Sequence, residues 1–172
     1  MNLVMSKKLF IGIDNGVTGS IGVISPDTSI FLPTPVKKEQ DYTKKKKNIS
    51  RINSIELFSF LKPHKDNFNS NEIIIALERP AINPQRWTSS MSAIRALEAT
   101  LNVIELLGLP FRYIDSKEWQ RELLPKGIKG TPELKKASMD IGLRLFPNHE
   151  ETILKQKDAD GILIAEYLRK NF

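Results

Sequence analysis

The sequence predicts an α/β fold in which a mixed β-sheet of about five strands is flanked by helices. Residues 9–14 and 20–25 are β-prone and are separated by a glycine-containing turn, which indicates a hairpin. The nearly continuous apolar run 72–78 is typical of a strand buried on both faces of a parallel sheet. Apolar residues at helical spacing over 89–107 indicate a helix between that strand and the next.

The segment between the hairpin and the apolar run is the least regular. Residues 29–36 are expected to form a third strand, which Pro33 and Pro35 confine to a sheet edge because proline cannot donate to the ladder. Residues 37–53 form the most polar stretch and are expected to be a mobile basic loop. A short amphipathic helix, ending before Pro63, is indicated by the spacing of Ile52, Ile55, Phe58 and Leu61.

The second half of the chain is expected to be mainly helical. After a short strand at 111–115, helices are predicted over 119–124, from Thr131 through Phe146, and over 159–169, with Pro132 as a first-turn proline. The apolar stripe of helix 89–107 serves either the core or a dimer interface. Its members are Met91, Ile94, Leu97, Leu101, Ile104 and Leu107.

The order of these elements is that of the RNase H-like fold, and a length of 172 residues fits one domain spanning 1–172. The 26 Lys and Arg residues exceed the 20 Asp and Glu residues, giving a net charge of +6 that favours a polyanionic partner such as nucleic acid. A basic but otherwise ordinary soluble protein explains the charge equally well. No segment reaches the ~20 apolar residues of a membrane span, so a cytoplasmic protein is expected, nucleoid-associated or in the host cytoplasm if phage-encoded.

The absence of cysteine excludes disulfides, thiolate zinc sites and cysteine nucleophiles, so metal ligands must be oxygen atoms or histidine. Both histidines, His64 and His149, lie in polar stretches without zinc-ligand spacing and are expected at the surface.

Acidic residues stand at the ends of the two strands that we expect to be parallel neighbours. Asp14 ends the first strand and Glu78 ends the apolar strand, so both carboxylates are expected at the same edge of the sheet. Turn capping explains either residue alone about as well. Asp160 shares a helix face with Leu163 and Ile164 and should point towards the sheet, which interaction with the helix N-terminus does not explain.

Asp158 is the fourth carboxylate of this set and has two interpretations. It either caps the last helix and supports the site, or it reaches the site from a non-helical conformation just before the helix. Converging carboxylates suit magnesium, a hard ion that prefers oxygen ligands. Two such ions about 4 Å apart would serve phosphodiester hydrolysis, with Mn²⁺ as a substitute.

Three sequence blocks resemble the RuvC-type Holliday junction resolvases, especially their phage-like and organellar branches. The blocks are GIDNG at 12–16 with the following glycines, ALE at 76–78, and ADGILIAEY at 159–167. The resemblance runs in order along nearly the whole chain and includes Trp119 and the loop 126–131.

The resemblance implies a homodimer that grips a four-way DNA junction and nicks two strands symmetrically. It implies that Asp14, Glu78 and Asp160 bind magnesium. Bacterial members usually carry a fourth ligand three residues before the last aspartate, where this chain has Lys157, so Asp158 is the candidate substitute. The lysine near the scissile phosphate is then Lys129, Lys135 or Lys136, and Lys129 is favoured because neighbouring glycines allow close approach.

Further DNA contacts are expected from the loop that follows Glu78 and from the glycine loop, where Lys126 lies. Arg79 and Arg86 are candidates in the first loop, and Trp87 either stacks on an unpaired base or, as we favour, packs on the following helix. The lysine run 44–47 either binds phosphates or is simply solvated.

Other functions remain open at this point. The glycine-rich opening also resembles the phosphate loop of sugar kinases, but those proteins need two domains. A nuclease for flaps or RNA/DNA hybrids and a non-catalytic protein that binds branched DNA are the remaining alternatives.

Overall fold

The computed structural model describes residues 7–42, 44 and 46–172, and its centre is a five-stranded sheet with the order β3-β2-β1-β6-β7. The strands β1, β2 and β3 pair antiparallel, whereas β6 and β7 run parallel to β1. This order and these directions confirm the mixed sheet of the RNase H-like fold. Their bounds are Leu9–Ile13 for β1, Ser20–Ile24 for β2, Ser29–Pro33 for β3, Ile73–Glu78 for β6 and Phe111–Ile114 for β7.

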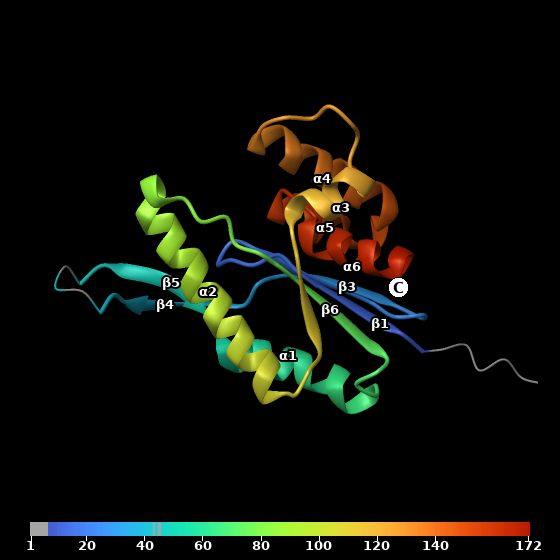
Figure 1. Cartoon of the computed structure of the whole chain (residues 1–172), viewed down its shortest axis with the longest axis horizontal. Helices are drawn as coiled ribbons and strands as arrows, with labels where there is room; N and C mark the ends of the chain where they lie inside the picture. The colour runs from blue at the N-terminus through green and yellow to red at the C-terminus, as the bar shows by residue number, and fades with distance from the viewer. Residues whose placement is uncertain (1–6, 43, 45) are drawn as a thin grey trace, which may run out of the picture.

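Helices cover both faces of this sheet, so each face has its own apolar core (Figure 1). On one face lie α1 (Ser54–Asn67) and α2 (Trp87–Leu106), packed on apolar side chains such as Ile11 and Ile75. The other face carries a cluster of four helices. These are α3 (Ser116–Leu123), α4 (Thr131–Leu145), α5 (Glu150–Gln156) and α6 (Asp160–Asn171). Short 3-10 turns, η1 (Pro84–Arg86) and η2 (Pro147–His149), precede α2 and α5.

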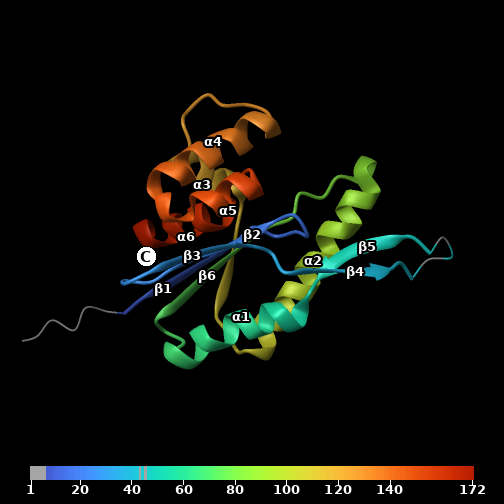
Figure 2. The same cartoon turned by 180° about the vertical axis from the view of Figure 1, so that it is seen from behind.

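The polar stretch predicted to be a mobile basic loop instead forms a two-stranded antiparallel ribbon. Its strands are β4 (Val36–Gln40) and β5 (Asn48–Ile52), which pair over their whole length. Figure 2 shows the ribbon extending beyond the five-stranded sheet beside α2. Ile52 is buried in the core and fixes one end of the ribbon. The loop prediction was wrong because charged side chains on an exposed ribbon leave its backbone pairing intact.

Two other predictions need correction. Helix α1 continues through Pro63 instead of ending before it. The proline removes one backbone hydrogen bond, but the burial of Leu57 and Leu61 against the core keeps the helix in place. Ile55, placed on the apolar stripe by its spacing, is 79% exposed. In α2 the buried residues are Ser90, Ala96, Thr100, Val103 and Ile104, so most of the predicted stripe lies at the margin of the contact.

The last helix lies unusually close to the sheet. A Cβ atom on Gly12 of β1 would come within 2.3 Å of the Gly161 carbonyl oxygen, and one on Gly22 of β2 would come within 2.2 Å of Ile162 Cα. Only glycine permits this approach. The Gly161 N–H also donates to the Ser20 hydroxyl at 3.0 Å. These contacts fix the start of α6, and therefore Asp160, beside β1.

None of the helices within the described ranges has both the length and the apolar character needed to cross a lipid bilayer.

Candidate metal centre

The parallel pairing of β1 and β6 brings two acidic residues to one edge of the sheet. Ile13 lies opposite Leu77, so the next residues, Asp14 just after β1 and Glu78 at the end of β6, lie at equivalent positions on this edge. Their carboxylates are close enough to share a hydrogen bond. The strand ends therefore meet in the way that the sequence pattern predicts.

Three aspartates converge at this edge. One carboxylate oxygen from each of Asp14, Asp158 and Asp160 lies within 4.8 Å of the other two. Asp158 is 1% exposed and is thus the most deeply buried of the three. The sequence-based set of Asp14, Glu78 and Asp160 differs from this geometric trio, because Glu78 contacts Asp14 without joining it.

Two side chains from α3 and α4 orient the carboxylates. The Trp119 Nε1–H donates to Glu78 Oε1 at 2.9 Å, and the indole ring is fully buried. The Ser138 hydroxyl donates to Asp160 Oδ1 and accepts the Ala159 N–H at 3.0 Å. A buried carboxylate that accepts a directed hydrogen bond loses rotational freedom, so both residues preorganise the site.

The backbone before α6 accounts for the position of Asp158. Lys157 is left-handed, with a φ of 65°, and ends α5, which turns the chain so that Asp158 enters the site while Lys157 remains exposed. The Asp158 Oδ1 atom accepts the Asp160 N–H at 3.4 Å, and its Oδ2 atom accepts from Lys135 Nζ at 2.6 Å. Asp158 therefore combines the two interpretations left open by the sequence, support of the helix start and entry into the site.

The electrostatics show that the site carries excess negative charge. Burial raises the pKa of Asp14 well above its ordinary value, and the charges of Glu78 and Asp160 raise it further. Burial, then the charge of Asp158, raises the pKa of Asp160 to about 7. Burial also raises the pKa of Glu78, against the Trp119 hydrogen bond. Desolvated, mutually repelling carboxylates are stabilised by a cation.

Of the four lysines predicted to serve DNA or catalysis, Lys135 contacts the carboxylates. Burial lowers its pKa, but the hydrogen bond and charge of Asp158 outweigh that effect and raise the pKa overall. Lys136 pairs with Asp140 at 2.7 Å on the exposed side of α4. Lys126 and Lys129 are exposed on the glycine loop. The favoured Lys129 therefore lies at the surface, while Lys135 reaches the site.

The loop after Glu78 keeps its candidate side chains at the surface. Arg79 pairs with Asp115 at 2.9 Å and lies 5.2 Å above the Tyr113 ring, and Arg86 is exposed in η1. Trp87 begins α2 and is 70% exposed. The favoured prediction that Trp87 packs on its helix was wrong, because its position in the first turn leaves the ring beyond the core.

The two histidines have structural partners. His149 Nε2 lies 2.9 Å from the Ser29 hydroxyl, and His64 packs edge-on against Phe60. Both are half-buried rather than fully exposed, and burial lowers the pKa of each.

The donor set fits a hard divalent cation. Four carboxylates supply oxygen atoms, the geometric trio is compact, and a single lysine offsets part of the charge. Sequence reasoning missed Ser138, which no motif marks. It noted Trp119 only through the resemblance, although a lone tryptophan in the polar helix SKEWQREL indicates a buried role.

Comparisons with known proteins reveal similarity to solved structures. No model of a protein family and no curated protein matches this sequence. The structure of T. thermophilus RuvC in complex with Holliday junction substrate has a TM-score of 0.49 and 16% identity, covering 95% of this chain and 96% of that chain. A second Thermus thermophilus RuvC structure has a TM-score of 0.44 and 17% identity, with the same coverage. At these identities the similarity concerns the fold alone.

Proposed function

We propose that this protein is a divalent-metal-dependent endonuclease that cuts four-way DNA junctions. The observation that carries the proposal is the convergence of Asp14, Asp158 and Asp160, with Glu78 in contact with Asp14, at one edge of the sheet. Oxygen-rich clusters of this kind suit Mg²⁺, and Mn²⁺ has compatible chemistry. The net charge of +6 is consistent with a nucleic acid substrate.

In this proposal each side chain of the site has a role in binding the metal ions, orienting the carboxylates or contacting the phosphate. Asp14, Asp158 and Asp160, assisted by Glu78, would hold two Mg²⁺ ions. When bound, these ions supply positive charge at the phosphodiester and lower the pKa of water. Trp119 and Ser138 keep Glu78 and Asp160 in orientation. The Lys135 ammonium holds Asp158 and is available to donate to a phosphate oxygen at the same site.

The junction as substrate is supported by the three sequence blocks that resemble RuvC-type resolvases. A junction has twofold symmetry, so we propose a homodimer with one metal centre per strand to be cut. The exposed side chains Arg79, Arg86, Trp87, Lys126 and Lys129 would contact DNA around each centre. Sedimentation that shows a monomer at micromolar concentration, with and without junction DNA, would contradict the dimer.

The test is cleavage of labelled four-way, duplex, flap and RNA/DNA hybrid substrates in Mg²⁺. We expect paired symmetric nicks in the junction, lost in Asp14→Asn while junction binding persists. The matched control is Asp140→Asn, because this exposed aspartate on α4 pairs only with Lys136 among the described residues. The control should cut at the rate of the wild type.

Each other outcome selects an alternative. Preferred cutting of flap or hybrid would retain the metal centre and discard the junction. Tight junction binding with no cutting in either Mg²⁺ or Mn²⁺ would identify a non-catalytic binding protein.

A further inference from the structure

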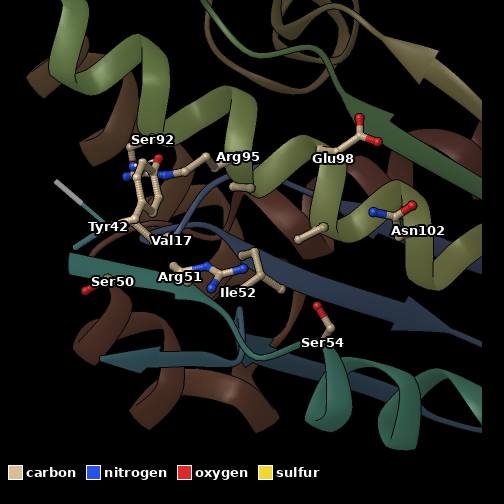
Figure 3. A pocket seen from close by; sticks show the side chains of 12 residues that line it. Val17, Tyr42, Ser50, Arg51, Ile52, Ser54, Ser92, Arg95, Glu98 and Asn102 are labelled. Atoms are coloured by element: carbon tan, nitrogen blue, oxygen red, sulfur yellow. Dashed lines mark hydrogen bonds between the residues drawn. The ribbon is translucent and has the colours of Figure 1, made fainter. Parts of the chain in front are cut away.

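A hollow lined by both polar and apolar side chains lies between the ribbon and α2, and we call it the ribbon groove. Its volume is about 280 Å³, and it is walled by β5, α2 and the loop that follows β1. Figure 3 shows Tyr42 and Arg95 facing each other, with Arg51 nearby on the ribbon. The remaining polar groups that line it are Ser50, Ser54, Ser92, Glu98 and Asn102.

Arg95 is the most unusual side chain in this groove. Its Nη1 atom donates to the Tyr42 hydroxyl at 2.9 Å, and its guanidinium carbon lies 5.9 Å from the centre of the Tyr42 ring. Its Nε atom is buried and has no hydrogen-bond partner within residues 7–42, 44 and 46–172. No ion pair to Arg95 exists within the described part of the chain. A half-buried guanidinium with a free donor and no counter-ion is costly unless an anion completes it.

The surrounding groups favour a phosphate as that anion. Serine hydroxyls, an asparagine amide and a tyrosine hydroxyl are the side chains that, with arginine, contact DNA phosphates. The one acidic residue of the lining, Glu98, extends away from Tyr42 and Arg95 (Figure 3). Arg51 is partly neutralised by Glu39 at 2.6 Å, which leaves Arg95 as the principal uncompensated charge.

The position of the groove favours a long polyanion over a small one. Val17 lines it and belongs to the loop that begins at Asp14, so one loop serves the metal centre and the groove. Asn15 ties this loop to α2 by donating to the Ala93 carbonyl at 3.2 Å. The same ribbon carries the exposed lysines Lys38, Lys46 and Lys47. The groove is therefore linked to the metal centre by one loop and is flanked by further positive charge, which suits a polyanion that contacts both.

We propose that the ribbon groove binds a backbone phosphate of a DNA arm, with Arg95 as the principal contact. This inference rests on DNA being the substrate of the proposed function. It adds a specific anchor on the opposite face of the sheet from α6, which Asp158 precedes and Asp160 begins. Arg95 holds the arm and takes no part in the bond-breaking step.

The test compares Arg95→Met with Arg144→Met, a matched exposed arginine on α4. Binding of a labelled four-way junction is followed by fluorescence anisotropy in EDTA over a range of salt concentrations, so that binding is measured apart from cutting. For Arg95→Met we expect about tenfold weaker binding and a salt slope shallower by about 0.9, the value for one lost phosphate contact. Arg144→Met should match the wild type in both.

Replacing single phosphates of the DNA, in combination with Arg95→Met, then identifies the phosphate that Arg95 contacts. Neutral methylphosphonates are placed one at a time along the junction strands. We expect one position at which the substitution weakens binding of the wild type but not of Arg95→Met. Arg95→Gln, which removes the charge but keeps a polar side chain able to donate to Tyr42, serves as the second variant if Arg95→Met melts early, and it should show the same shallower salt slope.

Two results would overturn the inference. One is an unchanged salt slope in Arg95→Met with the same methylphosphonate profile as the wild type. The other is a wild-type protein that binds no DNA. If the wild type binds DNA with the expected Arg95 dependence but cuts nothing, the groove stands and the nuclease proposal fails.

Discussion

The metal centre and the ribbon groove both contain buried charge that nearby groups do not fully neutralise, and the sign of that charge is opposite in the two regions. At the metal centre, carboxylates from β1, β6 and the start of α6 are desolvated together with too little positive charge. In the ribbon groove, a guanidinium on α2 is half-buried with no carboxylate partner among the residues that the structure describes. The first arrangement favours a cation and the second an anion.

The two regions also differ in how they are built. The metal centre joins segments far apart in the sequence, and its side chains are fixed by Trp119, Ser138 and close helix-sheet packing. The groove joins α2 to an exposed ribbon whose anchor in the core is Ile52. Under the proposed function, fixed side chains would serve the chemistry at the metal centre, and an uncompensated charge would serve DNA binding in the groove.

The largest expected effect separates the two regions by activity. Asp160→Asn should lower the single-turnover cutting rate by about 10³-fold or more, since charge stabilisation worth several kcal/mol is lost. Arg95→Met at saturating protein should cut at nearly the rate of the wild type, because it affects binding. Rapid-quench measurements of the cutting of a labelled junction give the single-turnover rate of each variant. Equal losses in the two variants would remove the distinction between the regions.

The second prediction concerns stability without metal. The folded-state pKa of Asp160 is about 7, above the unfolded value near 3.8, so the folded state binds the extra proton between these values. Its contribution to stability is therefore full below pH 4 and is lost as pH rises towards 7, a change of a few kcal/mol. We expect Asp160→Asn to gain stability over the wild type as pH rises from 4 to 8.

Chemical denaturation in EDTA across that pH range measures the difference. Asp140→Asn is the control and should show no such trend. A difference between wild type and Asp160→Asn that stays constant with pH would contradict the burial of an uncompensated carboxyl group.

A smaller effect is expected from the support of Glu78. Trp119→Phe keeps a buried aromatic ring but removes the Nε1–H that Glu78 accepts. Loss of such a support typically costs about 10- to 100-fold in metal affinity or activity. The Mg²⁺ dependence of cutting measures it, and Asp140→Asn is the control because this exposed side chain pairs with Lys136 outside the site. An unchanged Mg²⁺ dependence in Trp119→Phe would show that Glu78 needs no fixed orientation.

The smallest effect should come from the ribbon lysines. Replacing Lys46 and Lys47 with Ser should reduce the salt slope of junction binding by less than the ~0.9 per full phosphate contact, because both side chains are exposed and free to remain solvated. A reduction larger than that of Arg95→Met would place the anchor on the ribbon tip instead of the groove.

The strand-end carboxylates were predictable because their positions follow from a short-range pattern. An apolar strand that ends in an acidic residue indicates Asp14 and Glu78, and parallel pairing then brings them together. The inward direction of Asp160 follows from helical periodicity. These inferences need only the local sequence and the strand order.

The other features depend on contacts that no local pattern specifies. Asp158 enters the site because Lys157 adopts a left-handed conformation, and Lys135 rather than Lys129 reaches it because of where α4 packs. The ribbon was missed because its strands lack alternating apolar residues. The groove could not be predicted, because it is formed by the ribbon and by the face of α2 that carries Arg95, and the sequence pattern indicated neither.

The most direct test of the metal centre is to measure Mn²⁺ binding to the protein without DNA. Binding is detected as a decrease in the electron paramagnetic resonance signal of free Mn²⁺. The account predicts that the wild type and Asp140→Asn bind Mn²⁺ alike, whereas Asp14→Asn and Asp160→Asn lose most of that binding. Equal Mn²⁺ binding by all four proteins, or none by the wild type at millimolar concentrations, would contradict the assignment of the carboxylates as metal ligands.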